Sequence, residues 1–479
     1  MKQLIMNTRQ ALLAFGLATG LAACGNSFDI QNENAPTLDD LVSAPTRNKL
    51  ALTAIGINSQ IRNDIGADIW WYGVFGREGY NLQGNDNRNT GELIRGPLDG
   101  GSFGAALLAG KYQALRTIDT YLKAIPGAGD MTAAEKAAST GFGKTIKALQ
   151  LFRAILRNGT YGAPVDASQP VNAAPPPFLS EVNVYKHVVE LLEAAKTDLT
   201  AGGAAFPFAT PTGMTGFSTP ATFLKLNRGL LAKVLVFQAS MAACGNPCYT
   251  AAVAALNESF ITTAGLPGTL ESGVYFTFST AGGDATSPLA VSASSISFFA
   301  HPSLVTGAQN RANGSPDLRR QNKITDFTGD GGARTLDGLT GRYKFSVYFT
   351  SGSPDLAKGI PMIKNEELIL LRAEANLQLG NIQAAIDDID LIRTQSGGLA
   401  PTTLTVTSPK NDLITELLYN RTYSLMWESG TRWLDARRFG RLGSLPLDRA
   451  GDVTFSRMPI PTAECLARSL GDNCTPPVQ

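Results

Sequence analysis

The chain has 479 residues, of which 43% are hydrophobic and 17% are charged. Its 41 basic and 40 acidic residues leave a formal net charge of +1 at pH 7. Nucleic-acid-binding proteins need a strongly basic surface, so this balance argues against nucleic acid as a partner. The composition indicates a globular chain that can bury a large core, in one big domain or two interwoven lobes.

The N-terminus has the design of a bacterial export signal that ends in a lipidated cysteine. Lys2 and Arg9 precede an apolar run over residues 11–23, which is too short to span a membrane. The run ends in Leu21-Ala-Ala-Cys24, which resembles a lipobox. An ordinary signal peptide with a chance cysteine is the alternative. We expect three parts: a signal peptide over 1–23, a tether over 24–36 that carries acyl chains such as palmitate on Cys24, and a body over 37–479.

Four cysteines follow the lipobox, namely Cys244, Cys248, Cys465 and Cys474. An even number in an exported protein favours disulfides, and the local pairings Cys244–Cys248 and Cys465–Cys474 are the simplest of three connectivities. A zinc site of four thiolates is the rival interpretation. The wide spacing and an oxidising location argue against zinc, and we expect no metal and no cofactor.

The body divides into three parts that differ in composition and in the spacing of apolar residues. In the first, over 37–261, apolar residues recur at helical spacing in five segments: 38–62 with Thr37 as N-cap, 105–125, 131–158, 182–199 and 222–241. In the second, over 262–355, Gly, Ser, Thr and Asp dominate and only short β-like pieces occur. We expect this second part to carry ligand-binding loops on a helical scaffold.

Helical character returns in the third part, over 356–479. Residues 365–380 and 381–393 predict two antiparallel helices, the first ending at Gly380. Ala373, Gly380 and Ala385 match the small-residue positions of a tetratricopeptide repeat. Because such repeats bury their faces against neighbours, we expect a mostly α fold with about four helix pairs and a loop-rich insertion with short strands.

The stretch from Leu417 to Phe439 combines an apolar helical stripe with charged residues. Arg421 and Glu428 are seven residues apart, two turns along one predicted helix face, and Arg432 follows Glu428 by four. Buried charges are costly unless they pair and hydrogen-bond. We interpret five residues as a structural ion-pair network: Arg421, Glu428, Arg432, Asp435 and Arg438. A catalytic carboxylate in this stretch is the alternative.

Taken in order, these features resemble the SusD/RagB family of outer-membrane nutrient-uptake lipoproteins. The resemblance covers nearly the whole chain and is carried by the lipobox, Asn34-Ala-Pro36, Tyr161-Gly-Ala-Pro164, 367–380 with 389–399, the block from Arg421 to Arg438, and Pro459-Ile-Pro461 with Glu464. Two positions depart from the family pattern. Asn420 stands where the family usually has Glu, which removes one charge from the network, and Ser429 separates Glu428 from Gly430.

The resemblance implies a SusD-like fold with loops elaborated over one face. It also implies a lipid-anchored protein of the bacterial outer membrane, facing the cell surface. Such a protein captures an oligomeric nutrient, most often a glycan, and delivers it to a SusC-like TonB-dependent transporter as a hinged lid.

A glycan site needs flat aromatic rings for the sugar faces and polar groups for the hydroxyls. Trp427 and Trp433 are expected in the core, which leaves the Trp70-Trp71 pair beside an Asn-rich loop. We expect the ligand to contact Trp70, Trp71, Tyr72, Arg77, Tyr80, Asn85 and, from the loop-rich part, Tyr343, with Tyr348 as a second candidate there. The alternative is that one Trp packs into the core and the polar run is a solvated loop.

An enzyme is not expected. The chain has two histidines, His187 and His301, and lacks a nucleophile-elbow or phosphate-loop motif. The segment 326–332 is faintly similar to a calcium loop, but a Gly/Asp turn is the better interpretation. Two alternatives to a nutrient-binding lipoprotein stay open: a lipid-anchored helical-repeat scaffold that binds only proteins, and a glycan-cleaving enzyme.

Overall fold

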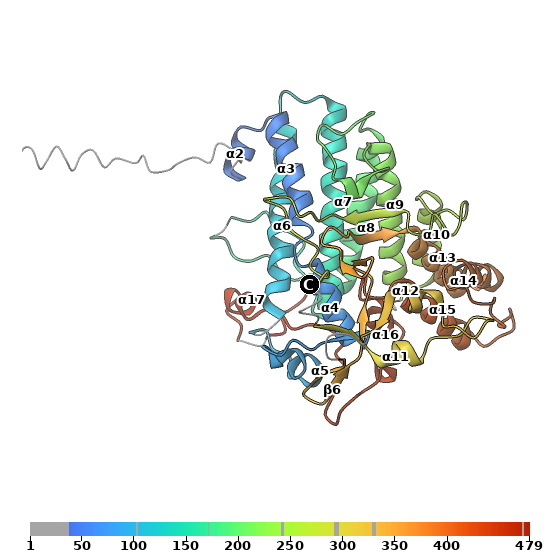
Figure 1. The fold of residues 1–479 in the computed structure, drawn as a ribbon. Coiled ribbons are helices and arrows are strands. Elements are labelled where there is room, and N and C mark those ends of the chain that lie inside the picture. Colours follow the sequence, from blue (N-terminus) through green and yellow to red (C-terminus); the bar gives the residue numbers. More distant parts are fainter. Residues whose placement is uncertain are drawn as a thin grey trace, which may run out of the picture.

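The structure is a computed structural model that describes residues 38–101, 104–170, 172–240, 244–291, 297–327, 332–471 and 474–479. The predicted signal peptide, tether and Cys24 lie outside these residues. Helices make up most of the described chain, and the short strands gather in the middle of the sequence. Figure 1 shows the long N-terminal helices standing side by side, with the C-terminal helices beside and below them.

In the described residues of the N-terminal part the α-helices are α2 (Leu38–Ser43), α3 (Arg47–Gln60), α4 (Ile65–Phe75), α5 (Glu92–Arg95), α6 (Gly104–Ala124), α7 (Ala133–Asn158), α8 (Glu181–Thr200), α9 (Pro220–Ala239) and α10 (Asn246–Asn257). From α6 to α10 each helix packs against the next. The capping box of Thr132 and Glu135 starts α7 at the residue where the apolar pattern begins. Local signals and packing therefore agree over these helices.

One predicted helix is in fact two. The prediction of a continuous helix over 38–62 was wrong, because the chain breaks between α2 and α3 at Pro45. Proline lacks the N–H of the helical ladder and disfavours the helical region for the residue before it. Thr46 then caps α3 by accepting a hydrogen bond from the Lys49 N–H.

The C-terminal part continues the helical array. Its helices are α13 (Asn365–Leu379), α14 (Ile382–Gln395), α15 (Lys410–Ser424), α16 (Thr431–Arg438) and α17 (Thr462–Ala467), while the short α11 (Pro302–Thr306) and α12 (Leu318–Lys323) lie in the loop-rich part. Gly380 ends α13 with a φ of 85°, in the left-handed region that glycine adopts freely. Ala373 and Ala385 are fully buried where α13 packs against α14, as a tetratricopeptide-like pair requires. Since α10 packs on α13, the two helical parts form one array.

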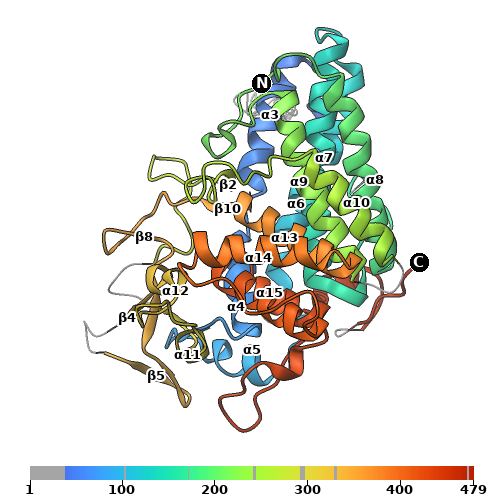
Figure 2. The same ribbon diagram turned by 90° about the vertical axis from the view of Figure 1, so that its right-hand side faces the viewer.

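The strands of the described ranges form four small sheets. The largest has the order β1 (Gly79–Asn81), β3 (Phe298–Ala300), β7 (Tyr343–Phe345) and β4 (Ile324–Asp326), all antiparallel. The two-stranded sheets pair β10 (Ile360–Lys364) with β2 (Gly273–Phe276), β5 (Arg334–Leu336) with β6 (Leu339–Gly341), and β8 (Phe349–Thr350) with β9 (Ser353–Pro354). Figure 2 shows these strands and their loops on the side of the molecule away from α7 to α10. We call this side the loop face.

Short 3-10 turns punctuate the chain at η1 (Asn87–Asn89), η2 (Ile125–Gly127), η3 (Gly159–Tyr161), η4 (Thr212–Met214) and η6 (Leu442–Ser444). Two disulfides join Cys244 to Cys248 and Cys465 to Cys474. Among the described residues, no helix has both the length and the apolar character that crossing a membrane requires.

Candidate ligand-binding site

The aromatic segment that the sequence offered as a sugar platform forms helix α4 and the strand after it. Trp71 and Tyr72 are 3% and 4% exposed, because α4 packs against α16 of the C-terminal block and is joined to α7 by the Asp68–Arg153 ion pair. Trp70 is half-buried, with its ring 5.4 Å from Trp71 and 5.9 Å from Phe298. A sugar could reach only Trp70 of these three rings.

Arg77 and Tyr80 are also buried. The Arg77 guanidinium donates to the carbonyl oxygens of Val74, Pro446 and Val453, which ties α4 to the C-terminal loop. The Tyr80 ring lies 5.1 Å from His301, and burial raises the pKa of its hydroxyl. The expectation that Trp71, Tyr72, Arg77 and Tyr80 face a ligand is therefore corrected: these side chains hold the core. Asn85 is exposed on the loop after β1.

The segment instead fixes the C-terminal block in place. A Cβ on Gly73 would lie 2.4 Å from the Trp427 ring, and one on Gly76 would lie 2.7 Å from the Trp433 backbone nitrogen. Only glycine allows α4 to approach the block so closely. Glu78, which is fully buried, accepts hydrogen bonds from the backbone N–H groups of Trp427 (3.3 Å) and Arg432 (3.4 Å). Burial raises the pKa of Glu78 to about 7, although the nearby Arg432 guanidinium lowers it.

Part of the charged block is one buried ion-pair cluster. Arg421 Nε lies 2.7 Å from Asp435, and Arg438 lies 2.8 Å from both Asp435 and Glu374. Glu374 comes from α13 and lies 3.6 Å from Arg421, so two carboxylates alternate with two guanidiniums. Burial lowers the pKa of Arg438, but the two carboxylates outweigh it and the net pKa is raised. Each charge is therefore compensated within the core.

Glu428 and Arg432 lie outside this cluster, because α15 ends at Ser424 and the chain then turns. The expected helical spacing between Arg421 and Glu428 was wrong for this reason. Glu428 pairs with Lys323 and Lys364, each at 2.8 Å. Burial alone would raise the pKa of Glu428. The two lysines together lower it by more than burial raises it, so the pKa lies below its usual range.

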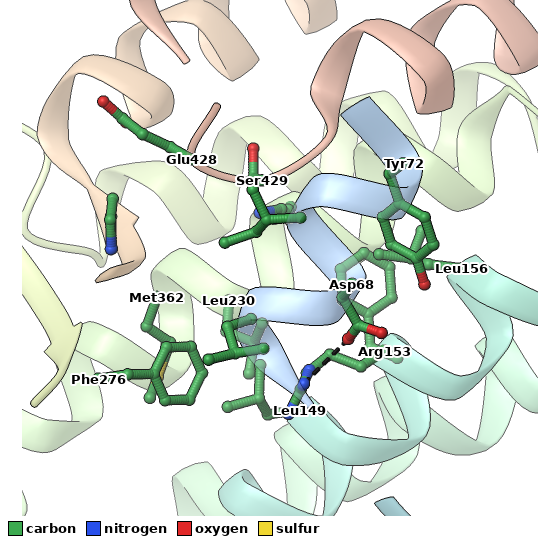
Figure 3. A pocket seen from close by; sticks show the side chains of 15 residues that line it. Asp68, Tyr72, Leu149, Arg153, Leu156, Leu230, Phe276, Met362, Glu428 and Ser429 are labelled. Atoms are coloured by element: carbon green, nitrogen blue, oxygen red, sulfur yellow. Dashed lines mark hydrogen bonds and ion pairs between the residues drawn. The ribbon is translucent and has the colours of Figure 1, made fainter. Parts of the chain in front are cut away.

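A cavity of about 60 Å³ lies between α4, α7, α9 and the block (Figure 3). Its walls are mostly apolar, and Asp68 and Arg153 form an ion pair at 2.9 Å on one side. Asp68 also pairs with Lys111 at 2.8 Å, where burial lowers the lysine pKa to about 8. Pockets for drug-sized ligands hold roughly 300–1,000 Å³, so this enclosed space is no site for an oligosaccharide.

The loop face also carries accessible aromatic rings. In β7, Tyr343 is half-buried, and the guanidinium of Arg342 lies 5.9 Å from its ring centre. Arg342 forms an exposed ion pair with Asp326 at 3.0 Å, and Asp326 is the cross-strand partner of Tyr343. Alternation along the strand places the next residue, Lys344, on the other face of the sheet.

Lys344 lies beside two more rings, so β7 has accessible rings near both of its faces. The Lys344 ammonium nitrogen lies 5.1 Å from the ring centre of Phe349 and 5.9 Å from that of Phe327, and both rings are half-buried. Tyr348, the second candidate from this region, is buried and donates to the Trp427 carbonyl. We define the β7 patch as Asp326, Phe327, Arg342, Tyr343, Lys344 and Phe349. Phe349 was missed because phenylalanine in a β-like segment suggests core packing, and Phe327 because its segment was interpreted as a Gly/Asp turn.

The two histidines have structural surroundings. His301 is buried and its ring nitrogens contact Ser303 (2.8 Å) and Asp448 (3.1 Å). Burial lowers the pKa of His301, while Asp448 raises it, and the net direction is down. His187 lies on α8, and burial lowers its pKa as well. The described part of the chain contains no group of three or more His, Cys, Asp or Glu residues that could hold a metal ion.

No family model and no curated protein matches this sequence. Solved structures do match. NanU of Bacteroides fragilis is 14% identical, with a TM-score of 0.65 over 91% of this chain and 97% of NanU. A SusD superfamily protein from Bacteroides vulgatus is 15% identical, with a TM-score of 0.68 over 88% of this chain and 97% of that one.

A third match is described as a laminarin-binding SusD-like protein. It is 16% identical, with a TM-score of 0.58 over 89% of this chain and 99% of that one. These likenesses extend over nearly the whole length of each protein. The chain therefore has the SusD-like fold, and the fold that its sequence resemblance implied is confirmed.

Proposed function

We propose that this protein is a lipid-anchored binding protein of the bacterial outer membrane, which captures an oligosaccharide at the cell surface and delivers it to a TonB-dependent transporter. The observation that carries the proposal is the SusD-like fold over about nine-tenths of the chain, shared with a protein described as laminarin-binding. The lipobox at Cys24 supports the anchor.

The β7 patch is the part of the molecule that best suits a sugar. It places the half-buried Tyr343, Phe327 and Phe349 rings beside charged groups that can hydrogen-bond to hydroxyls. Rings that are held by the scaffold and still reach solvent can stack on a sugar face without losing much conformational entropy. Trp70, the accessible member of the α4 group, is a further candidate, as is the exposed Asn85.

Titration calorimetry with a panel of oligosaccharides, laminarin fragments included, tests the site. For the member that binds, Tyr343→Ala and Phe349→Ala should each weaken binding about tenfold, which corresponds to roughly 1.4 kcal/mol. Tyr419→Phe is the matched control, since this half-buried tyrosine lies on α15 against Asp317 and Arg319. Unchanged affinity in both patch variants would remove the β7 patch as the site.

The same panel separates the two alternative functions. A helical-repeat scaffold for proteins alone should show no heat with any sugar. A glycan-cleaving enzyme should shorten the oligosaccharide that it binds, and chromatography of the recovered ligand would reveal this. The buried carboxylates Glu374, Glu428 and Asp435 give no support to either alternative function, because each is engaged by basic side chains in the core.

A further inference from the structure

A pocket of about 260 Å³ opens at the ends of the long helices, apart from the loop face. Its lining comes from the junction of α7 with η3, the start of α8, the ends of α9 and α16, and residues 456–457. Its floor contains the buried rings of Tyr185 and Phe237. Around this apolar floor stand the guanidiniums of Arg437 and Arg457 and the carboxylate of Glu181.

The scaffold holds both guanidiniums in position. Arg437 donates to the carbonyl oxygens of Leu156 (2.9 Å) and Ser456 (3.1 Å) and lies 4.8 Å from the Trp433 ring centre. Arg457 lies 4.0 Å from the ring centre of Tyr161 and donates to the Thr160 hydroxyl. Such stacking fixes the plane of a guanidinium and leaves other N–H groups free to donate.

Arg437 and Arg457 differ from the neighbouring Arg438, whose positive charge is neutralised by carboxylates. Arg438, which also lines the pocket, is paired with Glu374 and Asp435. Within the described ranges, no carboxylate forms an ion pair with Arg437 or Arg457. Glu181 is the acid that faces them: burial raises its pKa, and Arg437 and Arg457 lower it, with a net upward shift. The pocket thus keeps an excess of positive charge.

Charge, size and polarity together limit the ligand. Two fixed guanidiniums favour a carboxylate or a similar planar anion. Glu181 would repel a bare anion but can accept hydrogen bonds from hydroxyl groups on the same ligand. The volume lies below the roughly 300–1,000 Å³ typical for drug-sized molecules, so it suits one ring-sized unit and not a longer chain.

We propose that this pocket binds a sugar acid, with its carboxylate on Arg437 and Arg457 and its hydroxyls toward Glu181. The unit could be a free monosaccharide acid or the end of an acidic oligosaccharide, since both present the same group. This site stands independently of the β7 patch, because it lies on other elements and takes a charged ligand.

Calorimetric titration of the purified full-length protein tests the proposal, with sodium glucuronate, glucose and sodium sulfate as probes. Glucuronate should bind, glucose should not, and sulfate should bind at least tenfold more weakly than glucuronate. Arg457→Gln should weaken glucuronate at least tenfold. This variant removes the contacts to Thr160 and Tyr161 and the charge that faces Glu181, and a thermal melt checks that it folds.

Arg441→Gln is the matched control, because this half-buried arginine follows the same helix and contacts Asn411 and Thr415 outside the pocket. Its affinity for glucuronate should equal that of the wild type. The absence of glucuronate binding, or an unchanged affinity in Arg457→Gln, would overturn the site. Equal binding of sulfate and glucuronate would overturn the assignment to a sugar acid. Failure of the neutral oligosaccharide panel alone would contradict only the proposed function.

Discussion

At the scale of single residues, several buried charges of the C-terminal block pair with residues from distant segments. Arg421 and Arg438 meet Glu374 of α13, and Glu428 meets Lys323 and Lys364. Removing one member of such a pair costs about 3–5 kcal/mol, because the other charge is left uncompensated in the core. These residues therefore act on folding, with no need for contact with a ligand.

Glu78 gives a prediction about pH. Its folded pKa, about 7, lies above its ordinary value of 4.5 because the side chain is buried. The folded state therefore holds a proton that the unfolded state has lost, and stability should fall as the pH rises from about 4.5 to about 7. Glu78→Gln keeps a neutral acceptor and should abolish this part of the pH dependence, worth up to about 3 kcal/mol. Urea unfolding of both proteins at pH 5 and pH 8 measures it. If the two proteins differ in free energy of unfolding by the same amount at pH 5 and at pH 8, the raised pKa of Glu78 is contradicted.

At the scale of elements, α4 and the C-terminal block depend on close contact. Gly73 lets the Trp427 ring lie against the helix backbone, and the Trp433 backbone fits against Gly76. Trp427 in turn stacks on Phe345 of β7, in the four-stranded sheet, with ring centres 4.1 Å apart. The block thus connects the first helices of the chain to the sheet of the loop face.

Two glycine substitutions test this contact. Gly73→Ala places a Cβ into the Trp427 ring, and we expect it to lower the free energy of unfolding by about 1–3 kcal/mol. Gly56→Ala is the control, because this glycine of α3 has no atom within 4 Å of the added Cβ. There the gain in helix propensity should raise stability by roughly 0.5–1 kcal/mol. Denaturant unfolding compares the two, and opposite signs are expected. A stabilised Gly73→Ala protein would contradict the close packing.

The positions of the helices could be predicted from the sequence better than the long-range contacts that the helices and strands make. Helical periodicity and caps located α6 to α9 and the α13–α14 pair to within a few residues, because these signals are local. The pairing of β1 with β3 joins residues about 220 apart, and no local pattern encodes it. Four of the expected platform residues proved to be buried for a related reason. Composition placed aromatic rings near polar residues, but only the packing of α4 decides that Trp71 points inward and Trp70 partly outward.

At the scale of the whole molecule, a helical array carries a face of loops and short strands (Figure 2). The accessible rings of the β7 patch lie on the loop face, and the pocket of Arg437 and Arg457 lies at the ends of the long helices. We propose that the loop face holds the ligand while another side of the molecule docks to a transporter.

Affinity purification from detergent-solubilised outer membranes, with the tagged full-length protein at its native level, tests the central claim most directly. The account predicts that a large TonB-dependent β-barrel transporter co-purifies in near-equal amount. It also predicts that Cys24→Ser, which removes the acylation site, shifts the protein out of the membrane fraction. A stable monomer that never associates with such a barrel would contradict the account.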